Sequence, residues 1–302
     1  MKSIAGVVEG AVNVLCDAGF SRDEARGDAL VLARGVLGWS LADWLARSAA
    51  EAPESFQTNF SNLVKRRRKR EPVAYLLGTK EFYGRLFRVT RDTLIPRPET
   101  EGLVEAALAW LNSAELLRAS FPADAGQRPI RIVDVGTGTG CVAITLALEF
   151  RGAAPPAIIG TDTSDGALAV ARDNARRLGA TGVDFTLGNL LADVTGSIDL
   201  IVSNPPYVPA RDRHMLQQDV VGFEPAGALF GGEDGLETIR QLIPMARQAL
   251  APTSALMLEV GRGQADHVVG LLEAARFTSI HRHQDLQGID RIIVARLADR
   301  SL

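Results

Sequence analysis

The stretch SNPPY at residues 203–207 ends an apolar run that is typical of a buried strand. The side chain of Asn204 offers one carbonyl acceptor and two N–H donors, while Pro205 and Pro206 supply no backbone N–H and have fixed φ angles. The Asn204 side-chain oxygen and the Pro205 carbonyl can therefore accept both hydrogens of one NH₂ group. The ring of Tyr207 can lie against a flat amide or base. The stretch thus predicts a site for a planar nitrogen, although so short a motif is also compatible with a proline-stiffened turn.

The nitrogen of an amide or an exocyclic amine is a poor nucleophile because its lone pair is delocalised. Hydrogen bonds at both of its N–H groups draw electron density toward the nitrogen and direct the lone pair at an electrophilic carbon. Catalysis of this kind depends mostly on positioning and on fixed dipoles, and no His or Lys adjoins the motif. We predict Asn204, Pro205 and Tyr207 as catalytic residues, and Asn204, Pro205, Pro206 and Tyr207 as substrate-binding residues.

A glycine-rich loop, GTGTG at residues 136–140, lies between a predicted strand and a predicted helix. Its glycines let the backbone approach a ligand, and the helix N-terminus offers unpaired N–H groups. Alone, the loop is equally typical of a tight strand-to-helix turn. The next strand ends at Asp162, where an acid can accept hydrogen bonds from both hydroxyls of an adenosine ribose. We therefore predict cofactor contacts at Gly136, Thr137, Gly138, Thr139, Gly140 and Asp162.

The residues around the loop indicate which adenosine cofactor fits. The dinucleotide fingerprint needs a small residue where Cys141 stands, and Asp134 would repel a pyrophosphate. S-adenosyl-L-methionine has no phosphate and carries an ammonium and a sulfonium, which Asp134 would attract. The stretch DVGTGTG resembles the first motif of the Rossmann-like methyltransferases, whose sheet also ends in a β-hairpin. We expect S-adenosyl-L-methionine as cofactor, with S-adenosyl-L-homocysteine as product.

Strand and helix patterns alternate around both candidate sites. Apolar runs predict strands at residues 130–135, 157–162, 183–188, 198–203 and 255–260. Helical patterns lie between them at residues 140–150, 164–178 and 235–250. Residues 277–297 predict two β-runs joined around Gly288. The fold class is therefore α/β, a mostly parallel sheet with a final antiparallel hairpin, and ligands should bind at the carboxyl ends of the strands.

The front of the chain has a different pattern. Apolar residues recur there at three- and four-residue intervals, and Ser21 and Glu24 have the spacing of a capping box. Residues 1–80 predict a small helical bundle, residues 81–97 a β-hairpin linker, and residues 98–302 the α/β domain.

Bulk properties exclude several classes of protein. The 302-residue chain has a net charge of −3, so general attraction to nucleic acid is not expected. Its two cysteines, Cys16 and Cys141, have no metal-ligand spacing and are typical of a reducing compartment. The apolar runs are too short to cross a bilayer, so we expect a cytoplasmic protein without membrane contact. The basic run KRRRKR at residues 65–70 fits a solvated helix end, or alternatively a contact for RNA or an acidic protein.

Longer stretches carry a family resemblance. Residues 71–105, which include LIPRPETE, closely resemble the element before the catalytic domain in peptide-chain release factor glutamine methyltransferases of the HemK/PrmC type. Residues 224–240, 258–264 and 285–296 match the same family in order. The resemblance implies methylation by S-adenosyl-L-methionine of N5 of the glutamine in the Gly-Gly-Gln motif of release factors. It also implies that Asn204 contacts both the cofactor and the glutamine, and that the N-terminal bundle docks the release factor, the expected partner.

Other residues carry weaker predictions. After the third strand, Asn189 stands where the family commonly has an acid, and it can still accept a hydrogen bond from an adenine amino group. Leu190 would pack on the adenine face, so both are predicted cofactor contacts. Glu99 and Glu101 either reach the methionine end of the cofactor or serve the start of a helix.

Two further pairs are open to two interpretations each. Glu224 and Pro225 either line the glutamine pocket or shape a loop. His281 and His283 alternate along a predicted strand, but two histidines without a third ligand favour surface residues over a metal site. No metal is therefore predicted.

Three alternatives stay open on the sequence alone. A tetrad like NPPY also occurs in methyltransferases of adenine or guanine in nucleic acid, and the basic run favours that class slightly. The acidic net charge and the lack of a separate basic or zinc-bearing recognition domain oppose it, so direct nucleic-acid binding is not expected. A glutamine methyltransferase of a ribosomal protein and a cofactor-binding scaffold without activity are the other two.

Overall fold

The computed structural model describes residues 2–112, 129–152 and 154–297. The chain folds into two compact units. The smaller unit consists of Met1–Thr79 and Gln217–Phe223, and the larger unit consists of Lys80–Leu216 and Glu224–Leu302. A short segment from the second half of the sequence thus belongs to the N-terminal helical unit.

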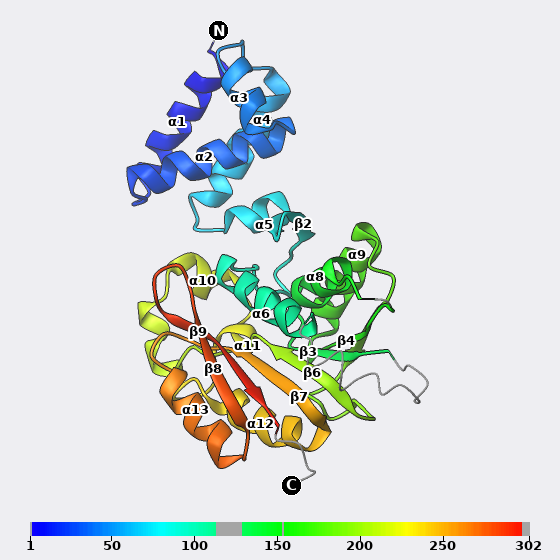
Figure 1. The fold of residues 1–302 in the computed structure, drawn as a ribbon. Helices are drawn as coiled ribbons and strands as arrows, with labels where there is room; N and C mark the ends of the chain where they lie inside the picture. Colours follow the sequence, from blue (N-terminus) through cyan, green and yellow to red (C-terminus); the bar gives the residue numbers. More distant parts are fainter. Residues whose placement is uncertain (1, 113–128, 153, 298–302) are drawn as a thin grey trace. The chain divides into compact units, whose positions relative to one another are not determined.

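The smaller unit is helical (Figure 1). Ser21 begins its second helix, where the side-chain oxygen accepts a hydrogen bond of 3.2 Å from the backbone N–H of Glu24. The complete reciprocal capping box occurs at Ser40 and Asp43. Phe56 and Phe60 stack in the core with ring centroids 5.2 Å apart. The helices are α1 (Ile4–Cys16), α2 (Arg22–Leu37), α3 (Leu41–Arg47), α4 (Glu54–Arg67), α5 (Val73–Leu77) and α10 (Gln218–Phe223).

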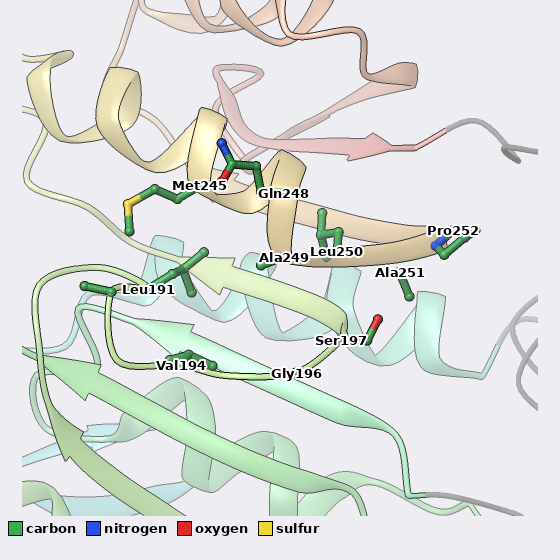
Figure 2. A pocket seen from close by; sticks show the side chains of 11 residues that line it. Leu191, Val194, Gly196, Ser197, Met245, Gln248, Ala249, Leu250, Ala251 and Pro252 are labelled. Atoms are coloured by element: carbon green, nitrogen blue, oxygen red, sulfur yellow. The ribbon is translucent and has the colours of Figure 1, made fainter.

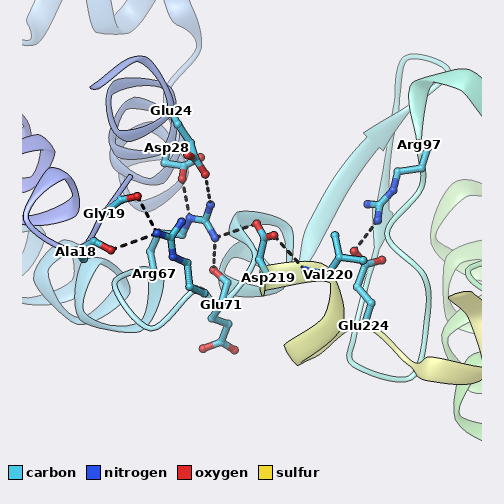
Figure 3. Close-up of polar contacts among 11 residues, drawn as sticks. Ala18, Gly19, Glu24, Asp28, Arg67, Glu71, Arg97, Asp219, Val220 and Glu224 are labelled. Atoms are coloured by element: carbon cyan, nitrogen blue, oxygen red, sulfur yellow. Dashed lines mark hydrogen bonds and ion pairs between the residues drawn. The ribbon is translucent and has the colours of Figure 1, made fainter. Parts of the chain in front are cut away.

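The basic run is partly structural. Arg67 is buried, and its guanidinium binds Asp28 at 2.6 Å, Glu24 at 3.2 Å and Asp219 of α10 at 3.3 Å (Figure 3). Arg70 donates hydrogen bonds to backbone carbonyls at the end of α1, and Arg66 pairs with Glu71. These cations hold the helical unit together, whereas Lys65, Arg68 and Lys69 of the run are exposed.

No single helix in the described part of the chain is long and apolar enough to cross a membrane. α2 and α3 meet the length and composition required only as a pair, and they are bent by 91° at the break between them. Ala25, Ala29 and Leu32 of α2 are fully buried inside the helical core. The apolar character of α2 is therefore explained by packing within its own unit.

The larger unit is built on a seven-stranded sheet in the order β5-β4-β3-β6-β7-β9-β8 (Figure 1). β3 to β7 pair in parallel, whereas β9 is antiparallel to both β7 and β8. The predicted fold class is thus confirmed. The strands are β3 (Arg131–Val135), β4 (Ala157–Asp162), β5 (Val183–Leu187), β6 (Ile198–Ser203), β7 (Leu250–Glu259), β8 (Thr278–Gln284) and β9 (Asp290–Arg296).

Helices cover both faces of this sheet. Successive strand residues point to opposite faces, so Ile132 packs with α6 and α8 while Val133 packs with α12 and α13. All six residues of β6 are buried, including the polar Asp199 and Ser203, and its other four residues are apolar, as expected for a strand covered on both faces. The helical segments are η1 (Pro98–Thr100), α6 (Glu101–Leu111), α8 (Cys141–Glu149), α9 (Asp165–Leu178), η2 (Ala210–Met215), α11 (Ala226–Leu229), α12 (Glu237–Ala249) and α13 (Ala265–Ala274).

Two element boundaries differ from the sequence pattern. The β-hairpin expected within residues 81–97 lies at β1 (Thr79–Phe82) and β2 (Arg85–Arg88), because Tyr83 and Gly84 both adopt positive φ and close the turn. β7 begins at Leu250 rather than near residue 255. Its first half contains Pro252, Thr253 and Ser254, which break the apolar pattern that marks a strand. The pairing of β7 with β6 also shifts in register there.

Candidate active site

The parallel strands β3 and β6 lie side by side at the point where the strand order reverses. The chain continues from β3 toward β4 on one side and from β6 toward β7 on the other. Crevices that bind ligands in open α/β sheets form outside the carboxyl ends of strands at such a point. A cavity of about 360 Å³ lies there, within the larger unit, and both predicted motifs contribute to it.

Asp162 anchors the glycine loop to the end of β4. One carboxylate oxygen accepts a hydrogen bond of 2.9 Å from the backbone N–H of Gly138, and the other accepts one of 3.0 Å from Ser164. Gly136 and Gly138 have φ angles of 74° and 55°, which residues other than glycine rarely adopt. Each carboxylate oxygen keeps a further lone pair for a ligand hydroxyl.

The structure separates the predicted cofactor residues into two groups. Six of them line the cavity: Gly136, Gly138, Asp162, Asn189, Leu190 and Asn204. The other three residues hold the loop from behind, and Thr137 and Thr139 are almost fully buried. The Thr137 hydroxyl donates to Asp134, the Gly140 N–H donates to the Thr137 carbonyl, and the Thr139 carbonyl accepts from Asn174.

Asp134 lies behind the glycine loop and does not line the cavity. Its carboxylate is 2% exposed and accepts hydrogen bonds from the Thr137 hydroxyl at 2.7 Å and from the Ala143 N–H at 3.2 Å. Burial raises the pKa of Asp134 to about 6, although these two hydrogen bonds oppose the change. Asp134 therefore ties the glycine loop to α8.

Leu190 adopts a backbone conformation that costs energy for a residue with a side chain. Its φ is 55°, a left-handed value that is rare outside glycine and costs about 1–3 kcal/mol. The Thr161 hydroxyl donates a hydrogen bond of 2.9 Å to the Leu190 carbonyl and so supports this conformation. The half-buried Leu190 side chain thereby lies at the cavity wall, beside the exposed Asn189.

The NPPY residues divide between two cavities. Asn204, Pro205 and Pro206 line the cavity at the switch point. Tyr207 instead lines a neighbouring cavity of about 440 Å³, between the segment after β6 and the loop after β7. Burial raises the pKa of the Tyr207 phenol to about 12, so the phenol stays protonated at neutral pH.

The side chain of Gln264 fixes the backbone of the tetrad. Its amide nitrogen donates to the Tyr207 carbonyl at 2.9 Å, and its amide oxygen accepts from the Gly261 N–H at 2.8 Å. The two partners are of opposite kinds, so the amide can have only one orientation. The sequence pattern did not identify Gln264 as a site residue, because its partner lies 57 positions away.

The loop before α6 contributes residues that sequence reasoning also missed. Arg91, Asp92, Thr93 and Leu94 line the cavity. The buried carboxylate of Glu224 holds this loop, because it accepts a hydrogen bond from the Ile95 N–H. It also accepts one from Arg97, which Figure 3 shows.

Of the remaining candidate residues, only Pro225 lines the cavity at the switch point. Glu224 therefore shapes the loop, and Pro225 forms part of the wall. Glu101 accepts a hydrogen bond of 2.8 Å from the Tyr83 N–H, and Glu99 lines a separate cavity beside β9. Within the described ranges, no group of three or more His, Cys, Asp or Glu side chains could hold a metal ion, and His281 and His283 are exposed on β8.

A larger hollow of about 600 Å³ lies at the opposite ends of the strands (Figure 2). It is formed by Gly196 and Ser197 before β6, by Leu250 and Pro252 of β7, and by Met245 of α12. Neither predicted motif reaches it. Its location at the amino ends of β6 and β7 makes it a poor candidate for the reaction site.

Comparison with known proteins assigns both parts of the chain. Residues 7–78 match the family described as the PrmC N-terminal domain, and residues 112–226 match the methyltransferase small domain. Among solved structures, the hMettl16 catalytic domain is similar with a TM-score of 0.54 at 14% identity, covering 91% of this chain and 92% of that one. A methyltransferase from Pyrococcus furiosus has a TM-score of 0.51 at 16% identity, covering 79% and 99%. These two likenesses show a shared fold.

Relatives that are more similar in sequence identify the family. The release factor glutamine methyltransferase of Bradyrhizobium diazoefficiens is 41% identical over 276 residues, which covers 91% of this chain and 89% of that protein. The protein of the same description from Cereibacter sphaeroides is 40% identical over 298 residues, covering 97% and 98%. Identity at this level over nearly the whole chain shows the family. The chain is a member of the release factor glutamine methyltransferases.

Proposed function

We propose that this enzyme transfers a methyl group from S-adenosyl-L-methionine to N5 of the glutamine in the Gly-Gly-Gln motif of peptide-chain release factors, in the cytoplasm. The observation that carries the proposal is the meeting of Asp162, the glycine loop and Asn204 on one cavity at the switch point of the sheet. Family membership selects a glutamine of a release factor as the methyl acceptor.

The cavity fits the cofactor in three respects. The anchored carboxylate of Asp162 can accept hydrogen bonds from ribose hydroxyls. Asn189 and Leu190 can contact the adenine, the first through its amide and the second through apolar packing. Gly136 and Gly138 leave room for the methionine end, because neither has a side chain. When bound, the cofactor supplies a methyl carbon attached to a sulfonium.

The protein's own contribution is to hold the acceptor nitrogen. The Asn204 side-chain oxygen and the Pro205 carbonyl accept the two N–H groups of the glutamine amide, which directs the nitrogen lone pair toward the methyl carbon. In the transfer, the nitrogen–carbon bond would form as the bond between the methyl carbon and the sulfonium sulfur breaks. S-adenosyl-L-homocysteine would leave, and the proton lost from the nitrogen would pass to water. Fixed acceptors of this kind act by positioning and by preorganised dipoles.

Tyr207 has a supporting part in this proposal. The half-buried Tyr207 lines the neighbouring cavity, and the Gln264 side chain holds its backbone carbonyl. In this proposal the ring lies against the glutamine amide and excludes water from it. The helical unit, which matches the PrmC N-terminal domain, binds the release factor outside the Gly-Gly-Gln motif.

A competition between substrates tests the proposal. The enzyme is incubated with S-adenosyl-L-methionine carrying a labelled methyl group, together with a purified release factor, ribosomal RNA and ribosomal proteins. We expect label in the release factor and none in the factor whose Gly-Gly-Gln glutamine is replaced by alanine. Label in the RNA or in a ribosomal protein, with an unlabelled release factor, would overturn the proposal.

A further inference from the structure

A buried carboxyl group lies next to the tetrad and has no part in the mechanism above. Glu259 is the last residue of β7 and is 1% exposed. The register of β6 against β7 pairs Ser203 with Leu258, which brings Glu259 alongside Asn204. One oxygen of Glu259 has no hydrogen-bond partner among the described residues, and the carboxyl group is hydrogen-bonded to the Thr100 side chain.

Thr100 connects this carboxyl group to Asn204. The Asn204 amide nitrogen donates a hydrogen bond of 3.0 Å to the Thr100 hydroxyl oxygen, and Thr100 is 3% exposed. A hydroxyl has a single hydrogen to donate. When that hydrogen goes to an ionised Glu259, Thr100 can only accept from Asn204, and the Asn204 side-chain oxygen must then be on the opposite side of the amide.

We propose that Glu259, acting through Thr100, is a positioning residue that sets the orientation of the Asn204 amide and presents its oxygen to the substrate. The inference rests on the proposed function, because it concerns the acceptor for the glutamine N–H. Neither residue touches the substrate in this scheme. A carboxylate can only accept, so it gives the three-residue chain one direction, whereas a protonated carboxyl group can donate to Thr100 and release the hydroxyl hydrogen toward Asn204.

The ionisation of Glu259 therefore controls the direction of the hydrogen bonds that link Glu259, Thr100 and Asn204. Burial raises its pKa to about 7, with the hydrogen bond from Thr100 and the charge of Arg291 opposing the change. The ionisable groups that face it are Arg97 and Glu99 before α6, Arg291 of β9, Tyr207 after β6 and Cys141 of α8. We expect turnover to rise with pH through about 7 as the carboxylate forms.

The test compares Thr100→Val, Thr100→Ser and Glu259→Gln with the wild-type enzyme. Thr100→Val should lower kcat about 10- to 100-fold, by analogy with partners that orient a primary ligand, with little change in cofactor affinity. Thr100→Ser keeps the hydroxyl and should restore most of the activity. Glu259→Gln should remove the rise of kcat through pH 7, because a glutamine amide does not ionise.

Thr145→Val is the matched control. Thr145 is also a fully buried threonine of the larger unit, but its hydroxyl has no hydrogen-bond partner among the described residues. This variant should keep wild-type kcat. An unchanged kcat in Thr100→Val, or an unchanged pH profile in Glu259→Gln, would overturn the inference. The proposed function would still stand in that case, provided that the wild-type enzyme methylates the release factor. Absence of that wild-type methylation would instead refute the proposed function.

Discussion

The backbone N–H of Gly138 donates a hydrogen bond of 2.9 Å to the side chain of Asp162, which joins the loop after β3 to the end of β4. The second oxygen of the same carboxylate accepts from the Ser164 N–H at the start of α9. One side chain thus holds two segments of the cavity wall and still offers lone pairs to a ligand. Its structural and its proposed ligand-binding roles are therefore coupled.

Asp162→Asn should weaken cofactor binding. An asparagine has one acceptor oxygen, so either Gly138 or Ser164 loses its partner and the ligand loses a charged acceptor. We expect the dissociation constant of S-adenosyl-L-homocysteine to rise about tenfold or more, which corresponds to about 1.4 kcal/mol. Isothermal titration calorimetry measures this constant, with Asp184→Asn at an exposed position of β5 as the control. Equal affinities in the two variants would contradict the assignment of Asp162.

Gly140 and Gly179 allow a matched test of packing behind the loop. Both have a φ of 77°, but a Cβ at Gly140 would lie 2.9 Å from a side-chain carbon of Ile144, whereas one at Gly179 would meet nothing within 4 Å. Gly179→Ala should lower the free energy of unfolding by about 1–2 kcal/mol, because alanine is disfavoured at this positive φ. Gly140→Ala should cost a further 1–3 kcal/mol, roughly, from overpacking. Urea unfolding of both variants measures the difference, and equal losses would contradict this account of the loop.

The sequence could predict the parts of the fold that local pattern determines. β4 and β6 lie at the predicted residues, because buried parallel strands read as apolar runs with clear ends. The start of β7 was missed, since Pro252 interrupts its pattern. For the site, the strand-to-loop motifs identified Asp162 and Asn204 as cavity residues.

What the sequence could not supply is pairing between distant segments. Thr100 and Asn204 lie 104 positions apart, and no local pattern connects them. Asp134 directly precedes the glycine loop, yet its side chain turns inward to Thr137 and Ala143 and does not line the cavity. Side-chain direction at a strand end depends on what packs behind it, and the sequence alone does not show this.

Arg67→Met should destabilise the helical unit. The substitution removes the cation that binds Asp28, Glu24 and Asp219. Because these acids keep some solvent exposure, we expect the free energy of unfolding of the helical unit to fall by about 3 kcal/mol. This value is at the lower end of the range for breaking a buried ion pair. Hydrogen exchange of the α4 amides measures it. Arg68→Met, at the exposed neighbouring position, should change stability by less than about 0.5 kcal/mol, and similar effects of the two variants would contradict a structural role for Arg67.

Glu259→Gln should change how stability depends on pH. The folded-state pKa of about 7 lies above the ordinary value of 4.5, so the contribution of Glu259 to stability is fully present below pH 4.5 and is lost as the pH rises through 7. A glutamine avoids that loss. The free energy of unfolding of the variant relative to wild type should therefore increase from pH 5 to pH 8. Denaturant unfolding at both pH values measures it, and a difference that is independent of pH would show that Glu259 ionises normally.

The most direct test of the central claim is mass spectrometry of a release factor after incubation with S-adenosyl-L-methionine and either wild-type enzyme or Asn204→Ala. The account predicts one added CH₂ group on the glutamine of the Gly-Gly-Gln peptide with wild-type enzyme. With Asn204→Ala the rate should fall about 10²- to 10³-fold, by analogy with the loss of one oxyanion-hole donor, while cofactor affinity changes little. Gln287→Ala, at an exposed hairpin position, is the control and should match wild type. An unmodified glutamine with wild-type enzyme, or full activity in Asn204→Ala, would contradict the account.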